Sequence, residues 1–208
     1  MRVKAWWLTL SLTSGFLLAM SAQDLSLRWR DNEIHITAPR IHFLTGKSLE
    51  KLKNGTAVPF DFQLTLWSGN RSTVFDRVFQ RYVVSYDLWE EKFAIVKQRG
   101  FAIRDNTRTN ESRRSASGLL PNAAEAWCVD SISISTLGLP QDQPIWVRLD
   151  IRSADPKDGS PVFGESGLSI ASLIELFSRP ARSSEQRWSL ESGPIRLDEL
   201  KHLSGRGT

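Results

Sequence analysis

The stretch SLEKLKNGTAVPFDFQLTLW, residues 48–67, decides the fold because its hydrophobic period changes halfway along it. Leu49 and Leu52 are three residues apart, which places them on one face of a short helix. Asn54-Gly55 ends that helix, since both residue types accept left-handed backbone geometry. Over residues 58–66 every second residue is apolar, the period of a half-buried strand. The sequence therefore predicts a helix-to-strand unit that closes one end of a β core.

Other alternating segments predict further strands. Residues 25–29 and 34–36 flank Asp31-Asn32, a pair that tolerates the positive φ of a tight hairpin. In IWVRLDIR, residues 145–152, four aliphatic residues alternate with a tryptophan, two arginines and an aspartate. Shorter alternating segments occupy residues 82–88, 93–95 and 132–134. Strands separated by turn-forming residues predict an all-β fold, mainly an antiparallel β-sandwich.

The sequence adds two or three short helices to this fold. Besides the helix that begins at Ser48, PNAAEAWC (residues 121–128) predicts a helix with Asn122 as its cap. SIASLIELFSR (residues 169–179) has apolar residues at helical spacing, and Pro180 follows its end.

The predicted organisation is a single domain over residues 23–203. Residues 97–120 are polar and rich in arginine, and we expect a basic loop there. Residues 204–208 are predicted to be a disordered tail.

The first 22 residues have the pattern of a secretory signal peptide. Arg2 and Lys4 precede an apolar stretch, and Ala19-Met20-Ser21 offers small residues at the two positions that signal peptidase inspects. The stretch is shorter than the roughly 20 apolar residues of a spanning helix. This favours cleavage after residue 21 or 22 over a retained anchor. We expect a periplasmic or secreted protein, with no integral membrane segment after cleavage.

Charge and cysteine content exclude several function classes. The formal net charge of +4 falls to +2 without Arg2 and Lys4, so the charge does not indicate a nucleic-acid partner. Cys128 is the single cysteine, which excludes an intramolecular disulfide. Unpaired cysteines are usually buried, and the three histidines are remote from Cys128 in the sequence.

Catalytic motifs are matched only superficially. Ser48 and Lys51 have the S-x-x-K spacing of penicillin-binding enzymes, but no K-T-G element follows. We interpret both residues as the surface of the predicted helix. GESG at residues 164–167 lacks the spacing of a nucleophile elbow, and residues 154–165 lack the ligands of a calcium loop. We expect no catalytic residues, no cofactor and no metal site.

Aromatic and basic residues offer a candidate ligand or partner surface. Trp67 and Trp146 fall on the polar faces of their strands, Arg148 and Arg152 follow on the second of these, and Trp188 is next to an arginine. Tryptophan beside guanidinium groups suits a groove for a glycan, peptide or lipid. The alternative is a structural role, either as the second layer of a sandwich or beneath the basic loop. Sequence alone does not show whether these residues cluster.

The order of elements resembles the bacterial exported family called domain of unknown function 4390. The resemblance includes the stretch at residues 48–67, QRYVVSYDLWEEKFAI, PNAAEAW, LPQDQPIWVRLDIR and RWSLES, in that order. It implies an extracytoplasmic, mainly β protein, and it brings no catalytic residues with it.

Three functions follow from the sequence. The first is a non-enzymatic binding or assembly module of the cell envelope, with another envelope protein pairing along an exposed strand edge. The second is a carrier or sensor of an apolar or glycan ligand. The third is an envelope hydrolase, which no recognisable nucleophile, base and orienting residue supports.

Overall fold

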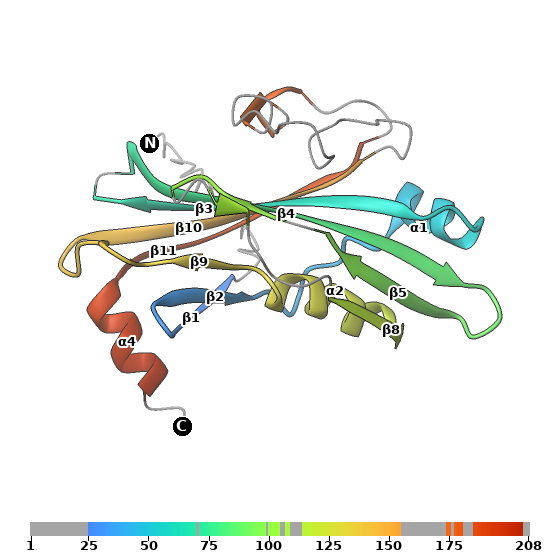
Figure 1. Cartoon of the computed structure of the whole chain (residues 1–208), viewed down its shortest axis with the longest axis horizontal. Coiled ribbons are helices and arrows are strands. Elements are labelled where there is room, and N and C mark those ends of the chain that lie inside the picture. Colours follow the sequence, from blue (N-terminus) through green and yellow to red (C-terminus); the bar gives the residue numbers. More distant parts are fainter. Residues whose placement is uncertain are drawn as a thin grey trace, which may run out of the picture.

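Two antiparallel β-sheets pack against each other in the computed structural model (Figure 1). The structure describes residues 25–69, 71–98, 100–104, 107–108, 114–154, 174–175, 177–180 and 185–205. The predicted signal peptide lies outside these residues, as does most of the helix predicted over 169–179. The described elements are β1 (Ser26–Arg30), β2 (Glu33–Thr37), α1 (Gly46–Lys53), β3 (Val58–Ser68), β4 (Thr73–Asp87), β5 (Lys92–Lys97), β6 (Phe101–Ala102), β7 (Thr107–Arg108), β8 (Ser115–Leu119), α2 (Pro121–Asp130), β9 (Ser133–Ser135), β10 (Pro144–Ser153), β11 (Arg187–Arg196) and α4 (Leu197–Gly205).

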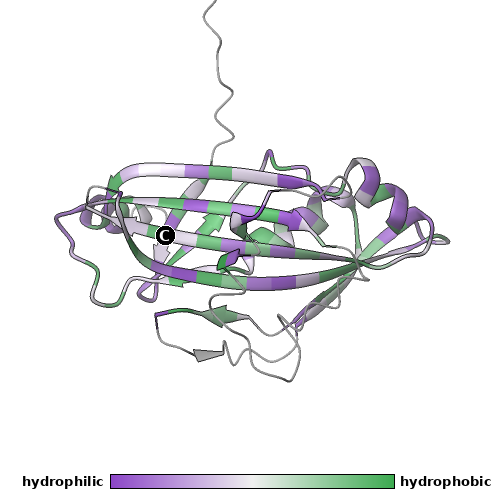
Figure 2. Ribbon diagram, turned by 90° about the horizontal axis from the view of Figure 1, so that it is seen from above, coloured by the Kyte–Doolittle hydropathy of each residue, from purple (hydrophilic) through white to green (hydrophobic). Residues whose placement is uncertain are grey.

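The larger sheet has the strand order β11-β10-β3-β4-β5-β8, and β6 joins it by pairing with β4 and β7. Its strands pair antiparallel, with β3 between β10 and β4. Hydrophilic and hydrophobic residues alternate along the long strands, as Figure 2 shows. The all-β sandwich with few short helices that the alternation predicted is confirmed.

The smaller sheet has the strand order β1-β2-β9. β1 and β2 form the predicted hairpin, and Asp31 and Asn32 have φ values of 52° and 62° in its turn. Both values are in the left-handed region that a two-residue turn between twisted strands requires.

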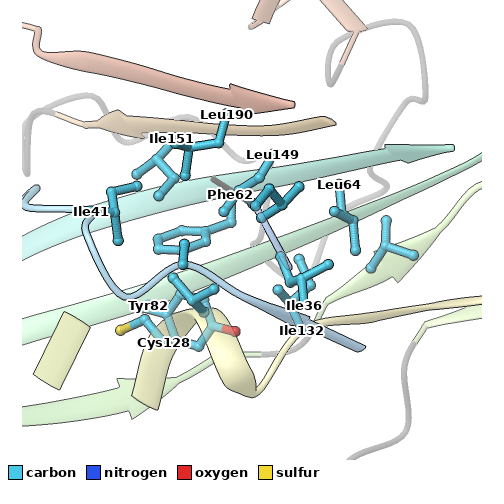
Figure 3. Close-up of a cluster of buried hydrophobic side chains, with 14 of the residues drawn as sticks. Ile36, Ile41, Phe62, Leu64, Tyr82, Cys128, Ile132, Leu149, Ile151 and Leu190 are labelled. Atoms are coloured by element: carbon cyan, nitrogen blue, oxygen red, sulfur yellow. The ribbon is translucent and has the colours of Figure 1, made fainter. Parts of the chain in front are cut away.

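The hydrophobic core lies between the two sheets and α2. Phe62, Leu149 and Ile151 from the large sheet point towards Ile36 of β2 and Cys128 of α2 (Figure 3). Their side chains are almost completely buried. The apolar faces of β3 and β10 are therefore the ones that the sequence period predicted.

The first two helices differ from the prediction at their N-termini, since α1 begins at Gly46 and not at Ser48. α1 ends as expected, with Gly55 at φ 79°. The predicted cap of α2 is wrong, because Leu120 is the N-cap and Pro121 is the first helical residue. Proline favours this position, since its φ is already helical and the N–H it lacks would have no helical partner.

Two predicted irregular segments contain regular structure. Residues 97–120 include β6, β7 and β8, so the expected loop is partly sheet. The predicted disordered tail is wrong at its start, because Ser204 belongs to α4, and residues 206–208 lie outside the described residues. Its Oγ accepts a hydrogen bond from the backbone N–H of Trp29 at 2.9 Å, which ties α4 to β1. No described helix combines the length and apolar character needed to cross a membrane.

Candidate functional site

The face of β3 that points away from the core is buried as well. Asp61 and Thr65 are 0% exposed and Gln63 is 8% exposed. The prediction of a half-buried strand is wrong here, because β3 lies inside the sheet and other segments cover its polar face. Among the covering segments, residues 174–175 and 177–180 lie over the side of the large sheet opposite α2 and the smaller sheet (Figure 1). We call this covered side of the large sheet the outer face.

A buried ion cluster crosses three strands on the outer face. Asp61 of β3 is opposite Arg81 of β4 and Arg152 of β10. Its Oδ1 accepts a hydrogen bond from Arg81 Nε at 2.5 Å, and its Oδ2 accepts from Arg81 Nη2 at 2.9 Å and from Arg152 Nη2 at 2.6 Å. One carboxylate therefore pairs with two guanidinium groups.

A second carboxylate connects this cluster to the segment before β11. Glu185 Oε1 lies 3.5 Å from Arg152 Nη1 and 2.8 Å from Arg187 Nε, and its Oε2 lies 3.2 Å from Arg179 Nη2. Burial lowers the pKa of Arg152, and the charge and hydrogen bond of Asp61 oppose that shift. The guanidinium stays protonated because arginine does not lose its proton in proteins.

Beside the ion cluster lies a pocket of about 360 Å³. It opens between the outer face and the segment that carries Phe177, whose ring packs 5.7 Å from the ring of Phe79 on β4. Pockets of this volume suit small molecules. The lining residues are Gln63, Trp67, Arg77, Arg148, Asp150, Ile151, Arg152, Ile174, Phe177, Ser178, Arg187, Trp188 and Ser189.

Four buried polar atoms of residues that line the pocket have no hydrogen-bond partner among the described residues. They are Nε and Nη1 of Arg152, Nε of Arg77 and Oε1 of Gln63. Arg152 is 2% exposed, and the contact of its Nη1 with Glu185 lacks hydrogen-bond geometry. A buried donor or acceptor without a partner costs about 1–3 kcal/mol, and more when it is charged. These lining residues therefore have hydrogen-bonding capacity that the described chain does not use.

The structure brings together four of the five residues predicted as a ligand or partner surface. Trp67, Arg148, Arg152 and Trp188 line the pocket. Trp146 pairs with Trp67 across β3 and β10, outside the pocket lining.

The ring of Trp188 has a different environment from the other predicted surface residues. Its centroid lies 6.2 Å from the ring of Phe43 and 6.4 Å from that of Phe60, within the core. Trp188 is therefore mainly a packing residue at the margin of the pocket.

The sequence reasoning missed Gln63, Arg77 and Phe177 in the pocket, and Asp61 in the cluster beside it. Asp61 and Gln63 alternate with apolar residues, and in a half-buried strand this period predicts that they face solvent. One signal was available: Asp61 and Arg81 lie on consecutive strands, and an Asp–Arg pair is favourable when the two are opposite. Phe177 lay in a predicted helix, whose position on the sheet the sequence does not give.

The residues first considered for catalysis have structural contacts. Ser48 is 3% exposed, so the prediction that it forms surface is wrong. Its Oγ donates to Gln186 Oε1 at 2.7 Å, and the same oxygen accepts from the Ser48 N–H at 3.0 Å. Lys51 is half-buried. Within the described chain, no three His, Cys, Asp or Glu side chains converge as metal ligands.

Cys128 is buried in the core, as the sequence predicted. Burial raises the pKa of its thiol well above the usual value, and the negative charge of Glu125 adds to the shift. A protonated, enclosed thiol is a poor nucleophile.

Comparison with known protein families, curated proteins and solved structures finds no match to this chain. The resemblance to domain of unknown function 4390 stays a prediction.

Proposed function

We propose that the protein is an exported, non-enzymatic binding module of the bacterial cell envelope that holds a small ligand in the outer-face pocket. The observation that carries this proposal is that residues lining the pocket have buried polar atoms that the described residues leave without partners. Native proteins satisfy nearly all buried polar groups. A ligand that fills the pocket supplies the missing partners.

A binding role agrees better with the local chemistry than an enzymatic role. In the pocket, Arg148 donates to Asp150 Oδ1 and to Ser189 Oγ, both at 2.9 Å. Arginine is a fixed cation that orients a ligand but does not exchange protons near neutral pH. The two nucleophile candidates, Ser48 and Cys128, are buried away from the pocket lining.

The test is a native mass spectrum of the protein expressed with its own leader and taken from the envelope fraction. We expect a chain that begins at Ala22 or Gln23 and carries an additional mass that denaturation removes. Intact Met1 in the cytoplasmic fraction would contradict export. An unliganded protein that also binds nothing from an envelope extract would contradict ligand binding.

A second candidate function is the docking of another envelope protein at one end of the large sheet. Leu88 and Trp89, in the turn between β4 and β5, are 56% and 97% exposed. Leu120, which is 65% exposed, follows the β8 residue that pairs with Phe93 of β5, so it lies near the same end. Exposed apolar residues that gather in one place mark interaction sites.

The docking candidate has its own test. Crosslinking in envelope preparations should capture a partner with the wild-type protein and lose it with Trp89→Ser. The matched control is Leu203→Ser, since Leu203 is similarly exposed on α4. An equal loss with both variants would contradict docking at the β4–β5 turn.

A further inference from the structure

The polar atoms of the pocket need acceptors more than donors. Three of the atoms without described partners are guanidinium nitrogens, which only donate: Nε and Nη1 of Arg152 and Nε of Arg77. The fourth, Gln63 Oε1, accepts. A carboxylate, phosphate or sulfate group offers several acceptor oxygens at once, and guanidinium groups bind such oxyanions in paired geometry.

The charges of the lining residues also favour an oxyanion as the ligand. The described lining residues include four arginines, Arg77, Arg148, Arg152 and Arg187, and one carboxylate, that of Asp150. Arg148 already pairs with Asp150. Behind Arg152, Asp61 is shared with Arg81 and Glu185 is shared with Arg179 and Arg187. Arginines therefore outnumber carboxylates among the described lining residues, which favours an anionic ligand.

Apolar residues that line the pocket suit the apolar part of a ligand. Trp67, Ile174 and Phe177 lie around the same cavity as the arginines. The Arg152 guanidinium carbon is 5.6 Å from the centre of the Phe177 ring. A ring or short aliphatic chain attached to an acid group would therefore meet apolar surface while its oxygens meet Arg152 and Arg77.

Granted the ligand-binding function proposed above, we propose that the pocket recognises a small organic anion, with its oxyanion group bound by Arg152 and Arg77 and its apolar body against Trp67 and Phe177. Gln63 Oε1 accepts a hydrogen bond from a hydroxyl or amide of the ligand, or from a protonated oxygen of its acid group. The ligand binds without a chemical reaction, so the site needs no co-reactant.

Isothermal titration calorimetry with three probes tests this proposal: phenyl phosphate, phenylacetate and the neutral phenylacetamide. We expect at least one anion to bind, and the amide to bind about tenfold to a hundredfold more weakly than the acid, since hydrogen bonds to charged groups contribute that much. An amide that binds as tightly as its acid would overturn the anion proposal while leaving ligand binding intact. If neither anion binds at millimolar concentration, the anion proposal also fails, and the native mass spectrum decides separately whether another ligand is held.

Two variants locate the anion site. Arg152→Gln removes the central donor but also disturbs Asp61, so its circular dichroism must match that of the wild type. Arg77→Gln leaves the pairs of Asp61 and Glu185 in place and should still weaken anion binding about tenfold. The control is Arg30→Gln, an exposed arginine on the β1–β2 hairpin. Equal affinity in Arg77→Gln and Arg30→Gln would place the anion elsewhere.

A further binding experiment distinguishes a lipid headgroup from a free small molecule as the anion. Phosphatidylglycerol vesicles present a phosphodiester on a membrane surface, whereas phenyl phosphate presents the monoester in solution. Flotation with the vesicles that Arg77→Gln abolishes would identify a lipid headgroup. Binding of the soluble ester alone would identify a free small molecule. Either result supports recognition of an anion at this pocket.

Discussion

Both faces of β3 are buried at the centre of the strand but differ in chemistry. On the core face, Phe62 packs with its ring centroid 4.8 Å from that of Tyr82, among aliphatic side chains. On the outer face, the preceding residue Asp61 is 0% exposed and is bound by two arginines. One face is filled by packing, and the other is filled by charges that must be paired.

This difference shows that the outer face contains buried charged groups that the stability of the fold does not require. Apolar surfaces complete each other without leaving a specific atom unmatched, since the hydrophobic effect has no direction. Buried charges must be matched atom by atom, and on the outer face Arg152 still lacks acceptors within the described chain. A surplus of buried donors beside a cavity is better explained by a ligand than by folding.

The largest effect is expected on the core face. Phe62→Ala should lower the free energy of unfolding by about 3–5 kcal/mol, because it removes a buried ring and leaves a cavity. Urea denaturation measures the change. Leu88→Ala is the control, since an exposed residue should change stability by less than about 0.5 kcal/mol. Similar losses in the two variants would mean that the core of the sandwich is not where the structure places it.

The outer face should be nearly as sensitive to the loss of one charge. Asp61→Asn is expected to cost about 3 kcal/mol, because Arg81 and Arg152 then keep buried positive charges with no carboxylate between them. Urea denaturation again gives the change. A cost below about 0.5 kcal/mol, the usual range for surface sites, would show that water reaches the cluster.

The sequence predicts those parts of this contrast that depend on neighbouring residues, and it does not predict those that depend on residues far apart in the chain. Alternation along β3 and β10 gave the strands and the core face correctly, because side-chain direction in a strand is a local property. The β1–β2 hairpin was also predictable, since its turn has two residues that need positive φ values, and Asp31 and Asn32 both tolerate them.

The ion cluster was beyond the sequence because it depends on register. Counted from the Ser68–Thr73 pair, an unbroken ladder would place Asp61 opposite Gln80. A bulge between Leu66 and Trp67 shifts the pairing, so Asp61 is opposite Arg81. A one-residue shift moves a side chain to the other face of the sheet. Arg152 comes from a strand much later in the chain, whose pairing no local pattern gives.

A smaller, pH-dependent effect should come from the core side. Because the pKa of Cys128 is raised by burial and by Glu125, the unfolded chain loses the thiol proton first. Above the unfolded pKa of about 8.5 the unfolded state binds fewer protons than the folded state, so stability falls as pH rises, by at most about 1.4 kcal/mol per pH unit. Below that pH the contribution is fully present.

Urea denaturation of the wild type and Cys128→Ala between pH 7.5 and 10 isolates this effect, since other titrating groups are common to both proteins. The difference in stability between them should shrink or reverse as the pH increases. Parallel pH profiles, or rapid maleimide labelling of the folded wild type, would mean that the thiol is more accessible than the structure indicates.

The smallest effect on stability is expected from the largest change to the outer face. In Asp61→Leu/Arg81→Met/Arg152→Met the whole cluster becomes apolar, and no buried charge of the triad is left alone. Replacing a complete buried ion group by apolar residues of similar volume is often neutral or stabilising. Glu185 keeps Arg179 and Arg187 as partners. We therefore expect urea denaturation to give a stability within about 1 kcal/mol of the wild type, while calorimetry shows no binding of the anion that the wild type holds. If stability falls as far as in Asp61→Asn, the cluster serves the fold. If stability is kept and binding is lost, the charges on the outer face are there for the ligand.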